Sequence, residues 1–339
     1  MSKLEFLPEG RSIDLSRELL VGAIDMHVHA GPHLPSSPRS VDPFEAAEQA
    51  RDAGMRAICY MDVFEMSTGT AWLVQRRVPG IQVYGGLVMN TVYGGMNPRA
   101  VRTALHYGSG ARFISFGTHS TYYQANREGR TIDGQFKSLG EIYPKFREQE
   151  LNRAIRIPVD GQPSPELDEI LTVVAEQPGV FLRSGHVSNE EALRLIDLAA
   201  EYGIENVVIA SGVTKNMPID QQKLAASKGA FIEHTLAAFT HTTPIPKTHY
   251  YVEKEYVSID EGMQEAPGMG VRTVAEQIRE VGAQHCIMCT DLGVYTLPPP
   301  VEGFREFIAC MLDLGITSDE IRTMTAINPA RILGLGEEN

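Results

Sequence analysis

The feature that most limits the fold of this chain is an apolar run followed by a helical pattern, which recurs eight times. Strands that alternate with helices form parallel sheets, because each helix carries the chain back to the start of the next strand. Eight such units predict a (β/α)8 TIM barrel, and a chain of 339 residues has a suitable length for it. The predicted strands lie at about 21–28, 56–61, 81–87, 112–116, 180–184, 206–210, 230–233 and 285–289.

An open, doubly wound sheet is the alternative fold. Such a sheet usually carries a glycine-rich phosphate-binding turn after an early strand. The glycine pairs at 85–86 and 94–95 do not have that spacing. We therefore expect a single barrel domain over residues 1–339, with long loops at about 118–164 and 236–268. Loops that follow strands lie on the face where barrels carry out chemistry, so these two loops are candidates for a lid.

Composition and charge limit the partners that this chain can bind. The sequence is 43% hydrophobic and 22% charged, as in soluble globular proteins, and its formal net charge is −13. This acidic balance disfavours nucleic acid and anionic membrane surfaces, which are bound through basic residues. Residues 1–10 lack the apolar core of a signal peptide, and the four cysteines are sparse. We expect a cytoplasmic protein with a small-molecule substrate, and homo-oligomerisation is left open.

The segment around His27 and His29 is the strongest candidate for a functional site. Side chains alternate along a strand, so Asp25, His27 and His29 are predicted on one face, opposite to Met26 and Val28. In a core, each of these polar groups would need a buried partner. Together, two imidazoles and a carboxylate suit a divalent metal ion. The alternative is a pair of histidines that only form hydrogen bonds at a strand end.

Other polar residues stand at or just after the ends of the later strands. The carboxyl ends of barrel strands meet at one mouth, so these residues converge if the sheet closes. A lone histidine at a strand end is more often structural, whereas several together predict a metal site. Arg183, inside an apolar strand, must also find a buried partner. The predicted ligands of one or two divalent ions, zinc or iron with manganese as a further option, are His27, His29, Glu65, His119, His186, His234 and Asp291.

This arrangement resembles the amidohydrolase superfamily of metal-dependent hydrolases. The shared features are His-x-His after the first strand, His186 after the fifth and Asp291 after the eighth, and residues 328–334 look like the usual C-terminal helix. Other stretches are similar to an amidohydrolase-like branch with altered metal ligands: residues 85–90, 94–98, 184–188, 229–234, 290–293 and 298–303. The resemblance implies an amidohydrolase-like barrel over about residues 20–335.

Two positions depart from the superfamily pattern. The histidine expected after strand six is replaced by Ser211, and no lysine is available after strand four, where His119 is nearest. Glu65, His119 and His234 could rebuild a second metal position. The predicted site is therefore rich in histidine.

Three functions are consistent with this site. The resemblance implies hydrolysis of a small organic substrate through metal-activated water, with Asp291 as the catalytic group that accepts the proton. The second is a non-heme diiron oxygenase or hydroxylase acting on an apolar substrate, because histidine and carboxylate ligands also suit ferrous iron. The third is a metabolite-binding barrel without catalysis, and its only support is Ser211 in place of a histidine.

Overall fold

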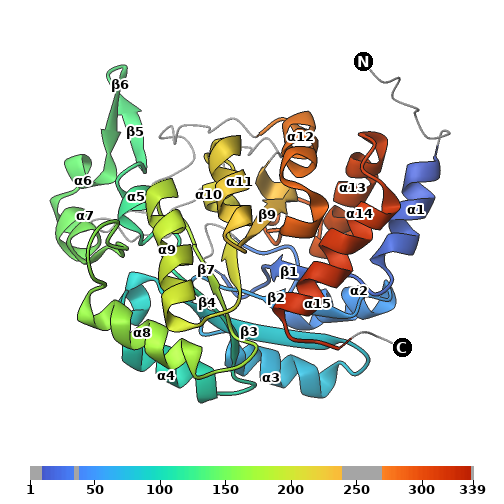
Figure 1. Cartoon of the computed structure of the whole chain (residues 1–339), viewed down its shortest axis with the longest axis horizontal. Helices are drawn as coiled ribbons and strands as arrows, with labels where there is room; N and C mark the ends of the chain where they lie inside the picture. The colour runs from blue at the N-terminus through green and yellow to red at the C-terminus, as the bar shows by residue number, and fades with distance from the viewer. Residues whose placement is uncertain (1–9, 34–37, 239–268, 337–339) are drawn as a thin grey trace.

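The structure is a computed structural model, and it describes residues 10–33, 38–238 and 269–336. Its main sheet has eight strands in the order β1-β2-β3-β4-β7-β8-β9-β10, all paired in parallel (Figure 1). Each strand therefore lies beside the next strand of the sheet along the chain, which is the topology of a (β/α)8 barrel. The strands are β1 Ile24–Val28, β2 Ala57–Tyr60, β3 Gln82–Val88, β4 Ala111–Ser115, β7 Phe181–Arg183, β8 Val207–Ile209, β9 Phe231–Thr235 and β10 Cys286–Cys289.

The first and last strands of the sheet meet at their carboxyl ends. The N–H of Asp291 donates to the carbonyl of His27 over 2.8 Å, and the N–H of His29 donates to the carbonyl of Leu292 over 2.8 Å. Val28 and Leu292 form a parallel bridge just beyond the end of β10. These contacts nearly close the sheet, and the predicted (β/α)8 barrel is confirmed.

Apolar side chains fill both sides of the sheet. The inner cluster has members from all eight strands, among them Met26, Cys59, Phe113 and Phe181. The rings of Phe113 and Phe181 lie 6.1 Å apart between centroids. The outer cluster joins the other face of the strands to the surrounding helices. The barrel interior is thus packed below the mouth, as is usual for this fold.

Helices follow the strands and cover the outside of the barrel (Figure 1). Two of the longer described helices begin at capping boxes: Asp42 with Glu45 for α2, and Ser188 with Glu191 for α9. The longer helices are α1 Arg11–Leu20, α2 Pro43–Asp52, α3 Thr68–Arg77, α4 Pro98–His106, α8 Pro165–Ala175, α9 Asn189–Tyr202, α11 Ile219–Ser227, α12 Val271–Val281 and α13 Pro300–Asp313. Short helical turns are η1 Thr91–Tyr93, α10 Ser211–Thr214, η3 Leu236–Ala238 and η5 Ala283–His285.

The segment 118–164 is more ordered than the polar loop that we expected. It contains an antiparallel hairpin, which projects from the barrel (Figure 1). A small separate core that includes Leu139, Phe146 and Leu151 stabilises this segment. Its elements are α5 Tyr122–Ala125, β5 Gly129–Ile132, β6 Gln135–Ser138, α6 Leu139–Ile142, α7 Pro144–Gln149 and η2 Leu151–Arg153. Most of the second expected loop, residues 239–268, lies outside the described residues, so its role as a lid stays a prediction.

Two further features concern the ends of the chain. Helix α1 was not expected, and it packs beside α13. At the C-terminal end, the helical region is divided into α14 Ser318–Arg322, a π-helical turn Thr323–Ile327 and α15 Asn328–Ile332. Pro329 has no N–H to donate to the preceding turn, which is a local cause of this irregularity. Among the described helices, none combines the length and the apolar composition needed to cross a membrane.

We predict that Gly85→Ala destabilises the barrel by about 1–3 kcal/mol through overpacking. A Cβ at Gly85 would lie 2.5 Å from the carbonyl oxygen of Ser67, so β3 and the start of α3 would have to separate. Gly336→Ala is the matched control, because nothing lies within 4 Å of its added Cβ. Urea unfolding of both variants measures the effect, and equal stability of the two would contradict this packing.

Candidate metal centre

The end of β1 carries a bulge that changes which side chains face the barrel interior. The register of β1 against β2 shifts between Asp25 and Val28. Ile24 and Met26 pack in the inner cluster, whereas Val28 packs in the outer one. The predicted strict alternation, with Met26 and Val28 on one face, is therefore wrong. The extra residue turns His27 into the interior directly after Met26, because a bulge sets two residues against one.

Asp25 does not share the site of the two histidines, although alternation predicted that it would. Its carboxylate accepts hydrogen bonds from the hydroxyl of Thr290 over 2.6 Å and from the N–H groups of Thr290 and His27, each over 3.1 Å. Burial raises the pKa of Asp25 to about 6, and the hydrogen bond from Thr290 opposes that rise. Asp25 thus ties β1 to the end of β10.

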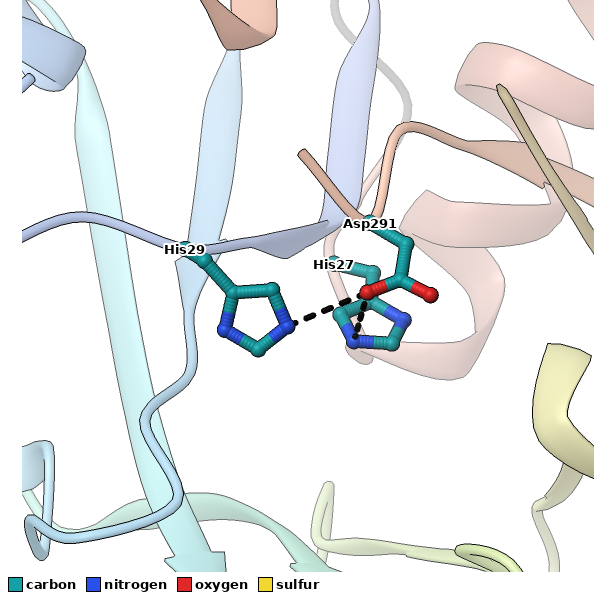
Figure 2. A group of neighbouring side chains, drawn as sticks. All are labelled: His27, His29 and Asp291. Carbon is teal, nitrogen blue, oxygen red and sulfur yellow. Dashed lines mark hydrogen bonds and ion pairs between the residues drawn. The ribbon is translucent and has the colours of Figure 1, made fainter. Parts of the chain in front are cut away.

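Three side chains converge at the mouth of the barrel: His27, His29 and Asp291 (Figure 2). The Oδ1 of Asp291 lies 3.2 Å from the Nε2 of His27 and 3.1 Å from the Nε2 of His29. Metal–ligand bonds of about 2.0–2.2 Å place neighbouring ligand atoms roughly 3–3.5 Å apart at the usual coordination angles. The spacing of these three atoms therefore fits a single divalent ion.

The hydrogen bond of His29 shows why a cation suits this position. Its Nδ1 lies 2.8 Å from the carbonyl oxygen of Met61, which can only accept, so Nδ1 carries the proton. In the neutral ring the lone pair of Nε2 then points at the carboxylate of Asp291, and both atoms are acceptors. Burial lowers the pKa of His29 to about 4, so the ring is neutral at neutral pH. A cation between the two acceptors resolves this conflict.

Asp291 reaches the two histidines from the end of β10 in a left-handed backbone conformation, with φ at 54°. Its side chain is 27% exposed, compared with 9% for His27, so it faces the open mouth. Burial alone would raise its pKa, but electrostatic interactions, chiefly that with His27, outweigh burial and hold the pKa well below its usual value. The hydroxyl of Ser211 donates to Oδ2 over 3.3 Å. Ser211, at the position where a histidine was expected, thus contacts the carboxylate.

A buried ion pair lies directly behind His27. Arg183 Nη2 lies 2.6 Å from Oε1 of Glu233, and Nδ1 of His27 lies 3.2 Å from the same oxygen and 2.9 Å from Nη2. The N–H of Ser211 donates to Oε2 of Glu233 over 2.8 Å. A metal ion at Nε2 of His27 requires the proton on Nδ1, and Glu233 is the acceptor for it. Arg183 has therefore found its partner in Glu233.

His186 lies next to the three-residue group without belonging to it. Its ring rests on the backbone of Gly212, where an added Cβ would lie 2.6 Å from Nε2. Its Nδ1 is buried and has no hydrogen-bond partner among the described residues. Burial lowers the pKa of His186 to about 3, with a smaller effect from the charge of Lys215. The ring of His119 lies 6.1 Å away between centroids.

The other predicted ligands lie outside the three-residue group. Nδ1 of His119 lies 2.7 Å from Oε1 of Glu128, on the segment before the hairpin. Glu65 accepts a hydrogen bond from Thr70 on α3. His234 lines a small cavity together with Glu233 and with Val274 of α12. The structure does not bring Glu65, His119 or His234 into ligand distance of the group, so their roles stay predictions.

Glu233 was missed in the sequence analysis, which took its neighbour His234 as the functional residue of β9. Alternation along β9 places Glu233 on the same face as Phe231, which belongs to the inner cluster. A carboxylate in one apolar strand and Arg183 in another were the available signal. Opposite charges buried in the same core usually pair, so these two residues could have been matched.

A model described as a family of unknown function (DUF6282) matches residues 22–233, which is more than half of the chain. A search of curated proteins gives no match.

Solved structures of similar fold include a probable dipeptidase, PvdM, from Pseudomonas aeruginosa. It has a TM-score of 0.61 at 12% identity, with 96% of this chain and 98% of that chain covered. A putative 2-pyrone-4,6-dicarboxylic acid hydrolase from Pseudomonas putida has a TM-score of 0.52 at 11% identity, with coverages of 94% and 99%. An amidohydrolase from Burkholderia multivorans has a TM-score of 0.53 at 11% identity, with 93% of this chain and 99% of that chain covered. The chain belongs to the DUF6282 family, and its barrel has the fold of the amidohydrolases.

Proposed function

We propose that this protein is a metal-dependent hydrolase that acts on a small organic substrate. The observation that carries the proposal is the meeting of two imidazole nitrogens and one carboxylate oxygen at 3.1–3.2 Å, with the other nitrogen of each ring held from behind. A metal-binding histidine typically binds the ion with one ring nitrogen and forms a hydrogen bond to a carboxylate or carbonyl with the other. The fold also supports the proposal, because similar structures carry the names dipeptidase and hydrolase.

His27, His29 and Asp291 would hold the ion. A bound ion would lower the pKa of its water from 15.7 to about 7 and would polarise the bond under attack. Oδ1 of Asp291 faces the histidines, while Oδ2 receives the hydroxyl of Ser211. The low pKa of Asp291 keeps it ionised, so it can accept a proton from the attacking water and pass it to the leaving group. Ser211 would orient the accepting oxygen.

His186 is proposed as a further ligand for two reasons. Its buried Nδ1 has no hydrogen-bond partner among the described residues, and its ring interacts electrostatically with Asp291. With His119 nearby, this side of the mouth is the proposed place for a second ion. The roles of Glu65 and His234 as ligands stay predictions.

We predict that the purified protein retains a divalent ion and that His29→Asn lowers its affinity for that ion by more than about tenfold. Loss of a group that only supports a ligand already costs about 10- to 100-fold, so loss of the ligand costs at least as much. His106→Asn, on the exposed end of α4, is the matched control. Elemental analysis after dialysis measures the effect. Zinc without oxygen uptake fits the hydrolase, and iron with substrate-dependent oxygen uptake would favour the oxygenase instead.

Asp291→Asn is expected to keep the fold but to lower turnover by about 100- to 10,000-fold, because an amide cannot accept the proton. The readout is proton release at constant pH with a panel of lactones, esters, amides and N-acyl amino acids. Thermal unfolding of the same sample shows that the variant is folded. Turnover equal to that of the wild type would remove Asp291 from the mechanism.

Glu233→Gln should destabilise the protein by about 3–5 kcal/mol at neutral pH, because it leaves Arg183 buried without its counter-charge. Burial opposes ionisation of Glu233, but Arg183 and His27 lower its pKa from 4.5 to about 2. The stabilisation is therefore complete above pH 4.5 and is lost as the pH falls towards 2. Urea unfolding at several pH values should show the gap between variant and wild type narrowing over that range.

The matched control for this experiment is Glu169→Gln, which removes the exposed partner of Arg102. An exposed pair contributes little to stability, so this variant should resemble the wild type. A difference between wild type and Glu233→Gln that stays constant from pH 7 to pH 2 would argue against an ionised Glu233.

A further inference from the structure

Arg39 lies at the mouth of the barrel, where the loop after β1 crosses the loop after β10. The two loops form an antiparallel bridge between Arg39 and Val294. On either side of it, the N–H of Ser40 donates to the carbonyl of Gly293 over 2.8 Å, and the N–H of Tyr295 donates to that of Pro38 over 3.2 Å. This backbone pairing fixes Arg39 opposite a residue that follows Asp291 by three positions.

The guanidinium of Arg39 is close to the candidate metal centre but forms no ion pair with the carboxylate of Asp291. It interacts electrostatically with the carboxylates of Asp62 and Asp291, and its charge helps to lower the pKa of His29, for which burial is the larger cause. Even so, the ion pairs that form among the described residues do not include Arg39. Its Nε is buried and has no hydrogen-bond partner within the described part of the chain.

Asp62, on the loop after β2, shows the same incomplete bonding. Its Oδ1 accepts the N–H of Phe64 over 2.6 Å, whereas its Oδ2 is buried without a partner among the described residues. Burial raises the pKa of Asp62 to about 6, against the opposing effect of Arg39. A structural ion pair would bring the two groups into direct contact, because a buried and unsatisfied charge is costly. Neither group is therefore satisfied by the other, and within the described part of the chain the Nε–H of Arg39 is free to donate to a ligand.

We propose that Arg39 binds a carboxylate group of the substrate and so makes the protein selective for carboxylate-bearing small molecules. This inference rests on the proposed function, because it names the substrate class of the same site. The planar guanidinium offers two parallel N–H donors, and its Nε–H with one Nη–H matches the two oxygens of a carboxylate. A phosphate dianion fits less well, because its two negative charges would be repelled more strongly than a single carboxylate charge by Asp62 and Asp291.

Arg39 would act by positioning. With one end of the substrate fixed at Arg39, the bond to be hydrolysed is directed towards Asp291 and the two histidines. A neutral analogue of the same shape would leave the charge of Arg39 buried and unpaired. The site would therefore discriminate strongly against neutral analogues and in favour of carboxylates. Arg39 is thus a specificity-determining residue and not a ligand of the ion.

The experiment compares carboxylates with their neutral amides on the protein as purified, with its metal content measured. Isothermal titration uses acetate, propionate and benzoate against acetamide, propionamide and benzamide, and inorganic phosphate is a further arm. The variants are Arg39→Met and Arg39→Lys. Arg102→Met is the matched control, because it removes one positive charge from an exposed ion pair on α4.

We expect the wild type to bind at least one carboxylate about 10- to 100-fold more tightly than its amide, as the loss of one charge-assisted interaction implies. Arg39→Met should abolish this preference with unchanged metal content, Arg39→Lys should retain part of it, and Arg102→Met should retain it fully. A carboxylate that binds Arg39→Met as well as it binds the wild type is held by the ion, and that result would overturn the inference.

Three other results would also overturn the inference: no carboxylate binds the wild type, amides bind as tightly as carboxylates, or phosphate binds more tightly than every carboxylate. These outcomes are separate from a failure of the proposed hydrolysis, which would appear as absence of metal or of turnover in the wild type. If Arg39→Met does not fold, the comparison of carboxylate with amide in Arg39→Lys and in the wild type still decides the question.

Discussion

The site depends on the closure of the sheet between its first and last strands. Two backbone hydrogen bonds of 2.8 Å join the region of His27 and His29 to Asp291 and Leu292, which lie more than 260 residues later in the chain. Without this pairing, the carboxylate would not reach the two imidazoles. Asp25 reinforces the closure from β1 by accepting hydrogen bonds from Thr290. The same contacts that complete the barrel therefore assemble the candidate metal centre.

Polar groups at the mouth are arranged so that each ligand is supported from behind. The carbonyl of Met61 fixes the ring of His29, and Glu233 lies behind His27. The charge of Glu233 is balanced by Arg183, which is itself fully buried. Ser211 contacts both Glu233 and Asp291 and so connects this buried pair to the ligand carboxylate. Such support keeps ligand nitrogens oriented and is typical of sites that bind metal.

A large part of the fold could be predicted from the sequence, because local patterns determine it. Eight apolar runs, each followed by a helical pattern, predicted the order of strands and helices, and the strands lie close to the expected bounds. The segment 118–164 was harder, since its hairpin and short helices depend on a small core formed by residues from several turns of the chain. Periodicity within one element does not reveal contacts of that kind.

By itself, the sequence determined which residue types stand at the strand ends, and therefore that imidazoles and carboxylates would gather at one mouth. The tertiary structure decided which of them meet. The bulge in β1 separated Asp25 from His27, and alternation along β9 turned Glu233 inward and His234 outward. The physical reason is that side-chain direction depends on register, and a shift of one residue reverses the face that a side chain occupies.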